Sequence, residues 1–278
     1  PPKRGRMIDL ARVDPHLCDA ISLVVQELAS TVQLDPANVL VVGANCRDIL
    51  HAGFGHAFPL RATTDTDLGI AVSDWTISHR IDAHYRHAGS NGIRYRIAGI
   101  AVDIMPFGEV EDPAGISHPA RRGEDLVVFG FRDVYARALP LRLPDGMAVR
   151  LPHPAGYAAL KMRSWIDRSV QGNDKDAKDL ALASFWYQES EAIADRLYGI
   201  DEEFQLLSDL GMDIGLAATR LLAMDASAQL SPENAADLAS RWRHTNHAAF
   251  ARDFLLPTAG PRIDSLARRQ QLSAQFQL

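Results

Sequence analysis

The chain has little cysteine and no long apolar run. Cys18 and Cys46 are the two cysteines among its 278 residues, too few for a disulfide framework and typical of a reducing cytoplasm. No stretch approaches the roughly 18 uncharged apolar residues that a membrane-spanning helix needs, and the N-terminal residues lack the apolar core of a secretory signal. We therefore expect a cytoplasmic protein that does not span a membrane.

An excess of basic residues is also missing. Lysine and arginine total 29 against 35 aspartates and glutamates, a net charge of −6. This balance argues against a protein that holds nucleic acid mainly by bulk charge, but it leaves room for a local basic groove. The sequence also contains no internal repeat, no Walker A loop and no His-Glu-x-x-His metal motif.

The pattern of apolar residues predicts two parts of different character. The composition, 47% apolar and 23% charged, is ordinary for a globular protein. The first part has strand-like runs between helices, and a turn at Ala98-Gly99 predicts a hairpin. After Pro154 the spacing becomes helical. Strands are expected at 38–43, 67–73, 93–97, 100–104, 126–129 and 147–151, and helices within 1–30 and at 44–51, 75–89, 155–168, 174–187, 189–207 and 231–256.

These elements predict an α+β (α/β) fold. A mixed sheet flanked by helices is expected over residues 1–152, and a helical domain over 153–278.

The segment from Arg61 to Asp67, Arg-Ala-Thr-Thr-Asp-Thr-Asp, is the most informative for chemistry. Residues two apart in a strand face the same way, so Asp65 and Asp67 present their carboxylates on one side. Adjacent carboxylates repel unless a cation lies between them, and Mg²⁺ prefers such oxygen ligands. The alternative for this spacing alone is a solvated strand end.

Two further features support a site near this pair. A strand ends at Gly43 and a helix begins, where free backbone N–H groups and the helix dipole favour phosphate. Asp103 alternates with apolar neighbours and is a third carboxylate on a strand; the alternative is an ordinary exposed position. A carboxylate beside a metal can act as general base toward an attacking hydroxyl.

The helical part contributes a lysine and acids. Lys161 adjoins the apolar face of the helix 155–168, where its ammonium can neutralise phosphate at a cleft; the alternative is a lysine lying along the surface, cheap to truncate. Asp176 and Asp179, three apart, share one helix face, although a helix start rich in acids explains much of this cluster.

The motifs occur in one order over residues 38–187, namely Val42-Gly43-Ala44, Arg61 to Asp67, Val102 to Gly108, Leu160-Lys161 and Lys175 to Leu180. In this combination the chain resembles the AbiEii/AbiGii-type nucleotidyltransferases, which include toxins of bacterial toxin–antitoxin pairs such as the MenT-like toxins. One departure is Ala44, because family members often have glycine or serine there. A serine contact to phosphate is therefore replaced by backbone N–H groups.

The resemblance implies a polymerase-β-like nucleotidyltransferase fold with a helical C-terminal part. It implies Asp65 and Asp67 as ligands of Mg²⁺ and Asp103 as a third carboxylate, metal ligand or base. It also implies nucleotide contacts from Lys161 and an essential acid at Asp176. Nucleotide-binding candidates are Gly43, Ala44, Arg61 and Lys161.

The expected activity is Mg²⁺-dependent transfer of a nucleoside monophosphate from an NTP to a hydroxyl. The family favours the 3′ end of tRNA as acceptor, with an antitoxin protein as partner. Two alternatives remain: the same chemistry on a small molecule or protein side chain, and a non-catalytic nucleotide- or partner-binding module. Arginines at 121, 122, 241, 243, 268 and 269 are candidates for RNA contact, although scattered arginines are more often solvated.

Overall fold

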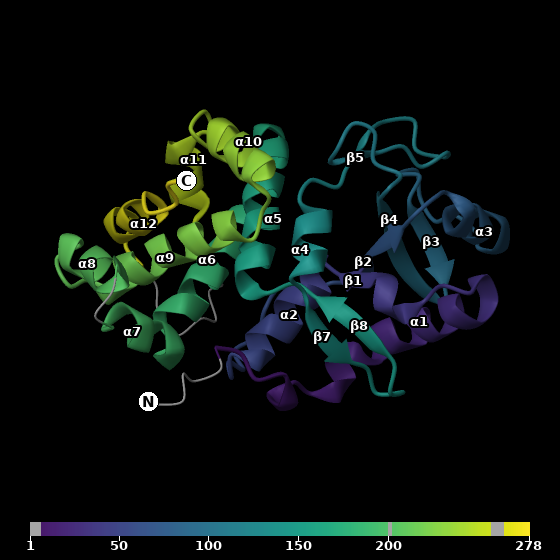
Figure 1. Ribbon diagram of the computed structural model, residues 1–278, viewed down its shortest axis with the longest axis horizontal. Coiled ribbons are helices and arrows are strands. Elements are labelled where there is room, and N and C mark those ends of the chain that lie inside the picture. The colour runs from purple at the N-terminus through teal and green to yellow at the C-terminus, as the bar shows by residue number, and fades with distance from the viewer. Residues whose placement is uncertain (1–6, 200–201, 257–263) are drawn as a thin grey trace. The chain divides into compact units, whose positions relative to one another are not determined.

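A computed structural model of the chain describes residues 7–199, 202–256 and 264–278 (Figure 1). These residues divide into two compact units. The sheet unit comprises residues 13–49 and 62–153, and the helical unit comprises 7–12, 50–61 and the described part of 154–278.

Two short N-terminal segments belong to the helical unit, whereas the sequence pattern groups them with the sheet. Side-chain packing explains this: Ile8 lies against Gly53, and the Trp186 indole donates a 3.1 Å hydrogen bond to Nδ1 of His51. Phe54 stacks on the same indole, with ring centroids 5.4 Å apart. A division read along the chain misses such contacts, because they join residues far apart in sequence.

The sheet unit contains a six-stranded mixed sheet, as expected. Strand β2 runs parallel to β4 along its whole length, and β1 pairs parallel with β8. The other neighbours are antiparallel. In spatial order the strands are β3 (Arg94–Ile97), β4 (Ile100–Gly108), β2 (Asp65–Val72), β1 (Val39–Val41), β8 (Ala148–Leu151) and β7 (Leu139–Arg142).

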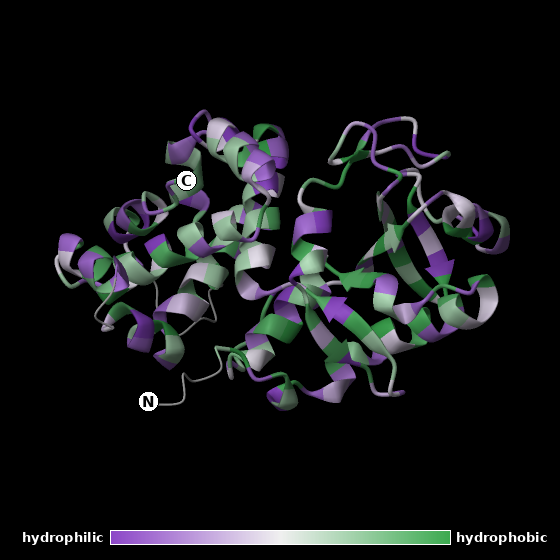
Figure 2. Ribbon diagram, viewed as in Figure 1, coloured by the Kyte–Doolittle hydropathy of each residue, from purple (hydrophilic) through white to green (hydrophobic). Residues whose placement is uncertain are grey.

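A tight turn sets the antiparallel pair of β3 and β4. Ala98 and Gly99 both have positive φ, 48° and 78°, and join β3 to β4 as the predicted hairpin. A separate two-stranded ribbon is formed by β5 (Ile116–Ser117) and β6 (Leu126–Val127). In Figure 2 the strands carry apolar and polar bands in turn, the pattern of strands with two different faces.

Four helices begin in the sheet unit. The first, α1 (Asp19–Val32), buries an apolar stripe that includes Ile21, Val24 and Leu28, and it contacts α3 and β3. The last of the four, α4, contacts β4, where the Phe131 and Phe107 rings meet edge to face. The remaining bounds are α2 (Gly43–Gly53), α3 (Thr76–His84), α4 (Phe131–Ala136) and the 3₁₀ turns Pro15–Cys18 and Pro36–Asn38.

The helical unit is built around three mutually contacting helices, α5, α6 and α9. Helix α6 is buried on nearly all sides, including Trp186 and Tyr187. The elements of the helical unit are α5 (Pro154–Arg168), α6 (Lys175–Gln188), α7 (Glu191–Leu197), α8 (Glu202–Asp209), α9 (Ile214–Ala228), α10 (Pro232–Trp242), α11 (His247–Asp253), α12 (Leu266–Ser273) and the 3₁₀ turns Leu10–Arg12 and Ser169–Gln171.

Four predicted helices differ from the observed ones, one of them only in length: the helix predicted over 75–89 is α3, which ends at His84. The helix predicted within 1–30 begins only at Asp19, after a 3₁₀ turn that starts with Pro15; residues 1–6 of that prediction lie outside the described residues. The helix predicted over 231–256 is two helices, because the Asn246 side chain accepts a hydrogen bond from the Ala249 amide and caps α11. The helix predicted over 189–207 is α7 and α8, and residues 200–201 lie outside the described residues.

Five of the described helices and strands were not predicted: β5, α4, β7, α9 and α12. Strand β7 contains Pro140, which normally argues against a strand, but β7 lies at the sheet edge, where a missing N–H is tolerated. Helix α9, for which no prediction was made, buries seven of its 15 residues. Within the described ranges, no helix combines the length and the apolar character needed to cross a membrane.

Candidate functional site

Asp65 and Asp67 lie on one face of β2. Both are partly exposed, whereas Thr66 and Leu68 between and after them are buried. This alternation is what an extended strand with one covered face requires. The two carboxylates therefore share a side of the sheet, as their spacing predicts.

Asp103 completes a row of acids across two neighbouring strands. The parallel pairing of β2 with β4 sets Asp103 directly beside Asp67. Asp103 is partly exposed, while Val102 and Ile104 on either side are buried, so its side chain lies on the non-core face. We call Asp65, Asp67 and Asp103 the acidic row.

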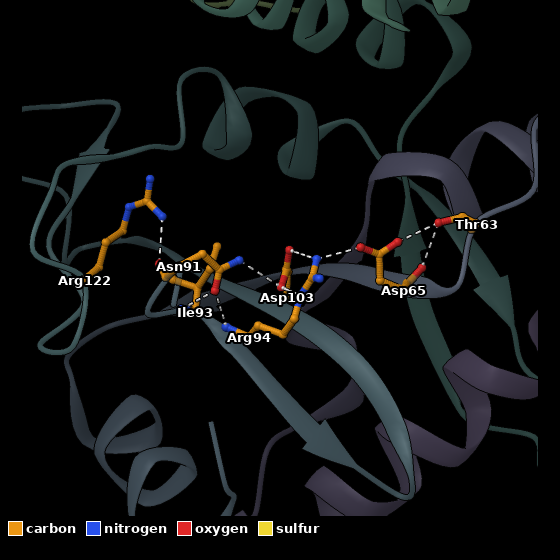
Figure 3. A network of polar contacts seen from close by, with 7 residues as sticks. All are labelled: Thr63, Asp65, Asn91, Ile93, Arg94, Asp103 and Arg122. Carbon is orange, nitrogen blue, oxygen red and sulfur yellow. Dashed lines mark hydrogen bonds and ion pairs between the residues drawn. The ribbon is translucent and has the colours of Figure 1, made fainter. Parts of the chain in front are cut away.

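Arg94 bridges two members of the acidic row. The β3–β4 pairing puts Arg94 opposite Asp103. Its guanidinium donates from Nε to Asp103 Oδ1 at 2.7 Å and from Nη2 to Asp103 Oδ2 at 2.9 Å. The same Nη2 donates to Asp65 Oδ2 at 2.6 Å. One cation thus lies between two of the three carboxylates (Figure 3).

Neutral side chains orient this network. The Thr63 hydroxyl donates to Asp65 Oδ1 at 2.7 Å. Asn91 donates from Nδ2 to Asp103 Oδ1 at 3.3 Å and accepts at Oδ1 from the amides of Ile93 and Arg94. Asn91 thereby joins the loop before β3 to the acidic row, and Figure 3 shows these residues in one connected chain of contacts.

The network favours the charged forms of Asp65 and Arg94. The Thr63 hydrogen bond lowers the pKa of Asp65 below its usual value; partial burial opposes this, and the Arg94 charge reinforces it. The hydrogen bond to Asp103 raises the pKa of Arg94, so its guanidinium stays protonated.

Gly43 brings the start of α2 against the acidic row. Its φ is +63°, and a Cβ built on it would lie 1.9 Å from Asp67 Oδ2. The Val42 amide donates to the Asp67 carbonyl at 3.1 Å. The glycine turn is therefore in direct contact with a carboxylate, and only glycine fits there without displacing it. Ala44 follows in the first turn of α2.

Lys161, Asp176 and Asp179 form a second cluster, within the helical unit. The ammonium of Lys161 on α5 lies 3.1 Å from Asp176 Oδ1 and 2.7 Å from Asp179 Oδ2, both on α6. Arg168 Nε lies 3.2 Å from Asp176 Oδ2. We call these four residues the lysine cluster. Two acids and two cations balance its charge.

Because Lys161, Asp176 and Asp179 are nearly buried, their ion pairs contribute to the stability of the fold. The side chain of Lys161 is 13% exposed, and those of Asp176 and Asp179 are 2% and 4% exposed. The alternative of a lysine lying along the surface is therefore wrong. Burial lowers the pKa of Lys161, but the charges of Asp179 and Asp176 outweigh it, and the net direction is upward.

The predicted site residues thus fall into separate groups. Gly43, Asp65, Asp67 and Asp103 come together in the sheet unit. Lys161 and Asp176 come together in the helical unit. Arg61 is exposed in the segment before β2.

The donor set of the acidic row suits Mg²⁺, because carboxylate oxygens are the hard ligands this ion prefers. In the part of the chain that the structure describes, no three carboxylate, imidazole or thiolate groups are arranged to hold a metal ion. In the acidic row, the Arg94 guanidinium lies between Asp65 and Asp103.

Sequence reasoning missed Arg94, Asn91, Thr63 and Arg168. A signal for Arg94 existed: a two-residue turn at Ala98-Gly99 pairs Ile97 with Ile100, and counting back pairs Arg94 with Asp103. Asn91, in contrast, sits in a loop whose path the sequence does not indicate.

Comparisons of the chain with protein-family models, with curated proteins and with solved structures find no match. The resemblance to AbiEii/AbiGii-type nucleotidyltransferases stays a prediction based on the motifs.

Proposed function

We propose that this protein is a Mg²⁺-dependent nucleotidyltransferase that moves a nucleoside monophosphate from an NTP to a hydroxyl acceptor. One observation carries the proposal: three carboxylates lie on adjacent strands, and one of them, Asp67, lies against a glycine turn at a helix start. Carboxylates suit a divalent cation, and the N–H groups of a helix start suit phosphate. Nucleotide transfer needs both functions side by side.

Within this proposal, Asp65, Asp67 and Asp103 would hold Mg²⁺, and the bound ion would polarise the phosphoryl oxygens of the nucleotide. The amides at the start of α2, after Gly43, bind phosphate. Asp103 is also a candidate base toward the attacking hydroxyl.

The lysine cluster has a proposed supporting role. Lys161 is assigned to the nucleotide phosphates by the resemblance. Lys161 is also paired with the carboxylates of Asp176 and Asp179. A lysine that contacts phosphate must therefore share its ammonium with acids already bound to it.

We propose RNA, with the 3′ end of tRNA first, as the acceptor, and a toxin's role opposed by an antitoxin. A local basic feature beside the acidic row supports this. Arg122 donates to the carbonyl of Asn91, the residue bound to Asp103. Neighbouring Arg121 lies 3.8 Å from Asp82 and keeps 60% of its side chain exposed, so a phosphate backbone can reach its guanidinium from the solvent side.

The test supplies each α-labelled NTP with purified tRNA, with protein substrates or with small hydroxyl compounds. Label on tRNA, dependent on Mg²⁺, is the expected result. Label confined to protein or small molecules contradicts the RNA acceptor and keeps the chemistry. No transfer to any acceptor with any NTP contradicts the enzyme and favours the non-catalytic module.

A further inference from the structure

The charge balance of the acidic row is the starting observation. Three carboxylates stand close together, and Arg94 is the cation that hydrogen-bonds to two of them. Its guanidinium engages both oxygens of Asp103 and Oδ2 of Asp65. Adjacent carboxylates repel, so Arg94 supplies the charge that holds them together.

We propose that Arg94 is the built-in counter-ion of the acidic row and that a divalent cation binds by displacing its guanidinium. The inference rests on the proposed function, because it takes these carboxylates to be the metal site. Arg94 thereby becomes a positioning residue that sets the affinity for the metal.

Shared oxygens make the two cations competitors. A metal held by Asp65 and Asp103 needs lone pairs on the same oxygens that accept the three Arg94 hydrogen bonds. A divalent ion within a few ångströms of a guanidinium also repels it in a partly buried site. Asp65 keeps its Thr63 hydrogen bond at the other oxygen, Oδ1, so its orientation does not depend on Arg94 alone.

The position of Arg94 allows the exchange without unfolding the strand. Strand β3 is at the sheet edge, and the Arg94 side chain is 33% exposed. A long side chain with this access can rotate toward solvent while its backbone pairing with Asp103 is kept. Asn91 remains bound to Asp103 Oδ1 and maintains that carboxylate's orientation.

The test is a calorimetric titration with MnCl₂ alone on the wild type, Arg94→Ala and Arg94→Lys. Arg94→Ala should bind Mn²⁺ about tenfold tighter or more, since a competing charge is gone. Arg94→Lys should fall between the two, because lysine keeps the charge but cannot make the bidentate contact.

Arg96→Ala is the matched control. Arg96 is two residues along β3 and exposed, and it donates to the carbonyl of Gly99 at 2.8 Å. Its loss removes the same charge from the same strand and should leave the Mn²⁺ affinity at the wild-type value.

Thermal unfolding supplies a second readout. Without metal, Arg94→Ala should melt below the wild type, and Mn²⁺ should raise its melting temperature by more than that of the wild type. If Arg94→Ala does not fold without metal, Arg94→Lys carries both measurements.

Two results overturn the inference: Mn²⁺ affinity of the Arg94 variants equal to or below that of the wild type, and no Mn²⁺ binding by any variant. The proposed function is judged separately, by label transfer with the wild type. Transfer without tighter binding in the variants would refute only the inference. Tighter binding without transfer would refute only the proposed function.

Discussion

At the scale of single residues, the acidic row and the lysine cluster respond differently to mutation. The acidic row is partly exposed and faces away from the core of the sheet. In the lysine cluster Lys161, Asp176 and Asp179 are nearly buried and Arg168 is half exposed, and its acids and cations form ion pairs with one another. Loss of a charge should therefore cost activity in the first and stability in the second.

Asp67→Asn should abolish nucleotide transfer while the chain stays folded. The amide removes a metal ligand's charge and relieves repulsion from Asp103 beside it. Activity should fall about 100-fold or more, the scale for a main electrostatic contribution to catalysis, and the unfolding temperature should hold or rise slightly. Label transfer and thermal unfolding are the measurements.

Asp74→Asn serves as the control for this change. Asp74 follows β2 and accepts a hydrogen bond from the Thr76 amide at the start of α3, a role that asparagine also fills. Full activity of Asp67→Asn would refute the metal assignment.

Lys161→Ala should destabilise the protein by about 3–5 kcal/mol, the usual loss when one partner of a buried ion pair is removed. Two nearly buried carboxylates would lose their main counter-charge. This reverses the expectation for a surface lysine, which is cheap to truncate. Urea unfolding measures the loss.

A control variant and the pH dependence of stability both test the ion pairs of Lys161. Lys178→Ala removes a 40% exposed lysine paired with Asp174 and should cost below about 1 kcal/mol. The raised pKa of Lys161 means that its contribution is full below its unfolded value of 10.5 and is lost as the pH rises through the folded value. A loss as small as that of Lys178→Ala would show that the ammonium is solvated.

At the scale of elements, the turn between β1 and α2 is the most constrained piece of backbone at the site. Gly43 combines a left-handed φ with contact to Asp67. Gly211 has nearly the same φ, +67° against +63°, but no atom lies within 4 Å of the position of its Cβ. Comparing substitutions at Gly43 and Gly211 therefore separates the cost of a left-handed φ from the cost of a collision with the Asp67 carboxylate.

Gly43→Ala should therefore reduce both the stability of the protein and its transfer activity more than Gly211→Ala does. Each substitution places alanine in the left-handed region, at a cost of about 1–2 kcal/mol. Only Gly43→Ala must also push the Asp67 carboxylate aside, so its stability should fall further and its transfer activity should drop. Equal stability losses with unchanged activity in both variants would mean that the turn and the carboxylate do not interact.

Element type was largely predictable and element pairing was not. Period-two alternation indicates β3 and β4, and the Ala98-Gly99 turn sets their register. Nothing local indicates that β2 pairs parallel with β4, because residues between two parallel strands do not determine their alignment. The approach of Asp67 to Asp103 depends on that pairing.

At the scale of the whole molecule, the net charge of −6 shapes the expected binding to RNA. Binding must depend on local arginines such as Arg121, because the chain as a whole repels phosphate. Each phosphate contact releases counterions, which makes such binding sensitive to salt.

Transfer to tRNA should weaken by about tenfold or more between 50 and 200 mM NaCl, for a few phosphate contacts. The measurement is the transfer rate at limiting tRNA across this range. Transfer to a small hydroxyl compound, if it occurs, should change little and serves as the control. A tRNA rate that stays constant with salt would contradict an acceptor held through its backbone.

The sequence by itself determined the class of fold and the candidate residues. Periodicity separates a strand-rich first part from a helical second part, and alternation puts Asp65 and Asp67 on one face. Both are local properties of the chain, set by side-chain direction within one element.

Beyond the β3–β4 hairpin, whose turn pairs Arg94 with Asp103, tertiary structure decided which charges meet. It placed Arg94 between Asp65 and Asp103, and it buried Lys161 with two acids from the next helix. The physical reason is that an ion pair depends on distance and burial, and both are set by how elements pack. The same lysine is a solvated surface residue or the centre of a buried cluster according to that packing.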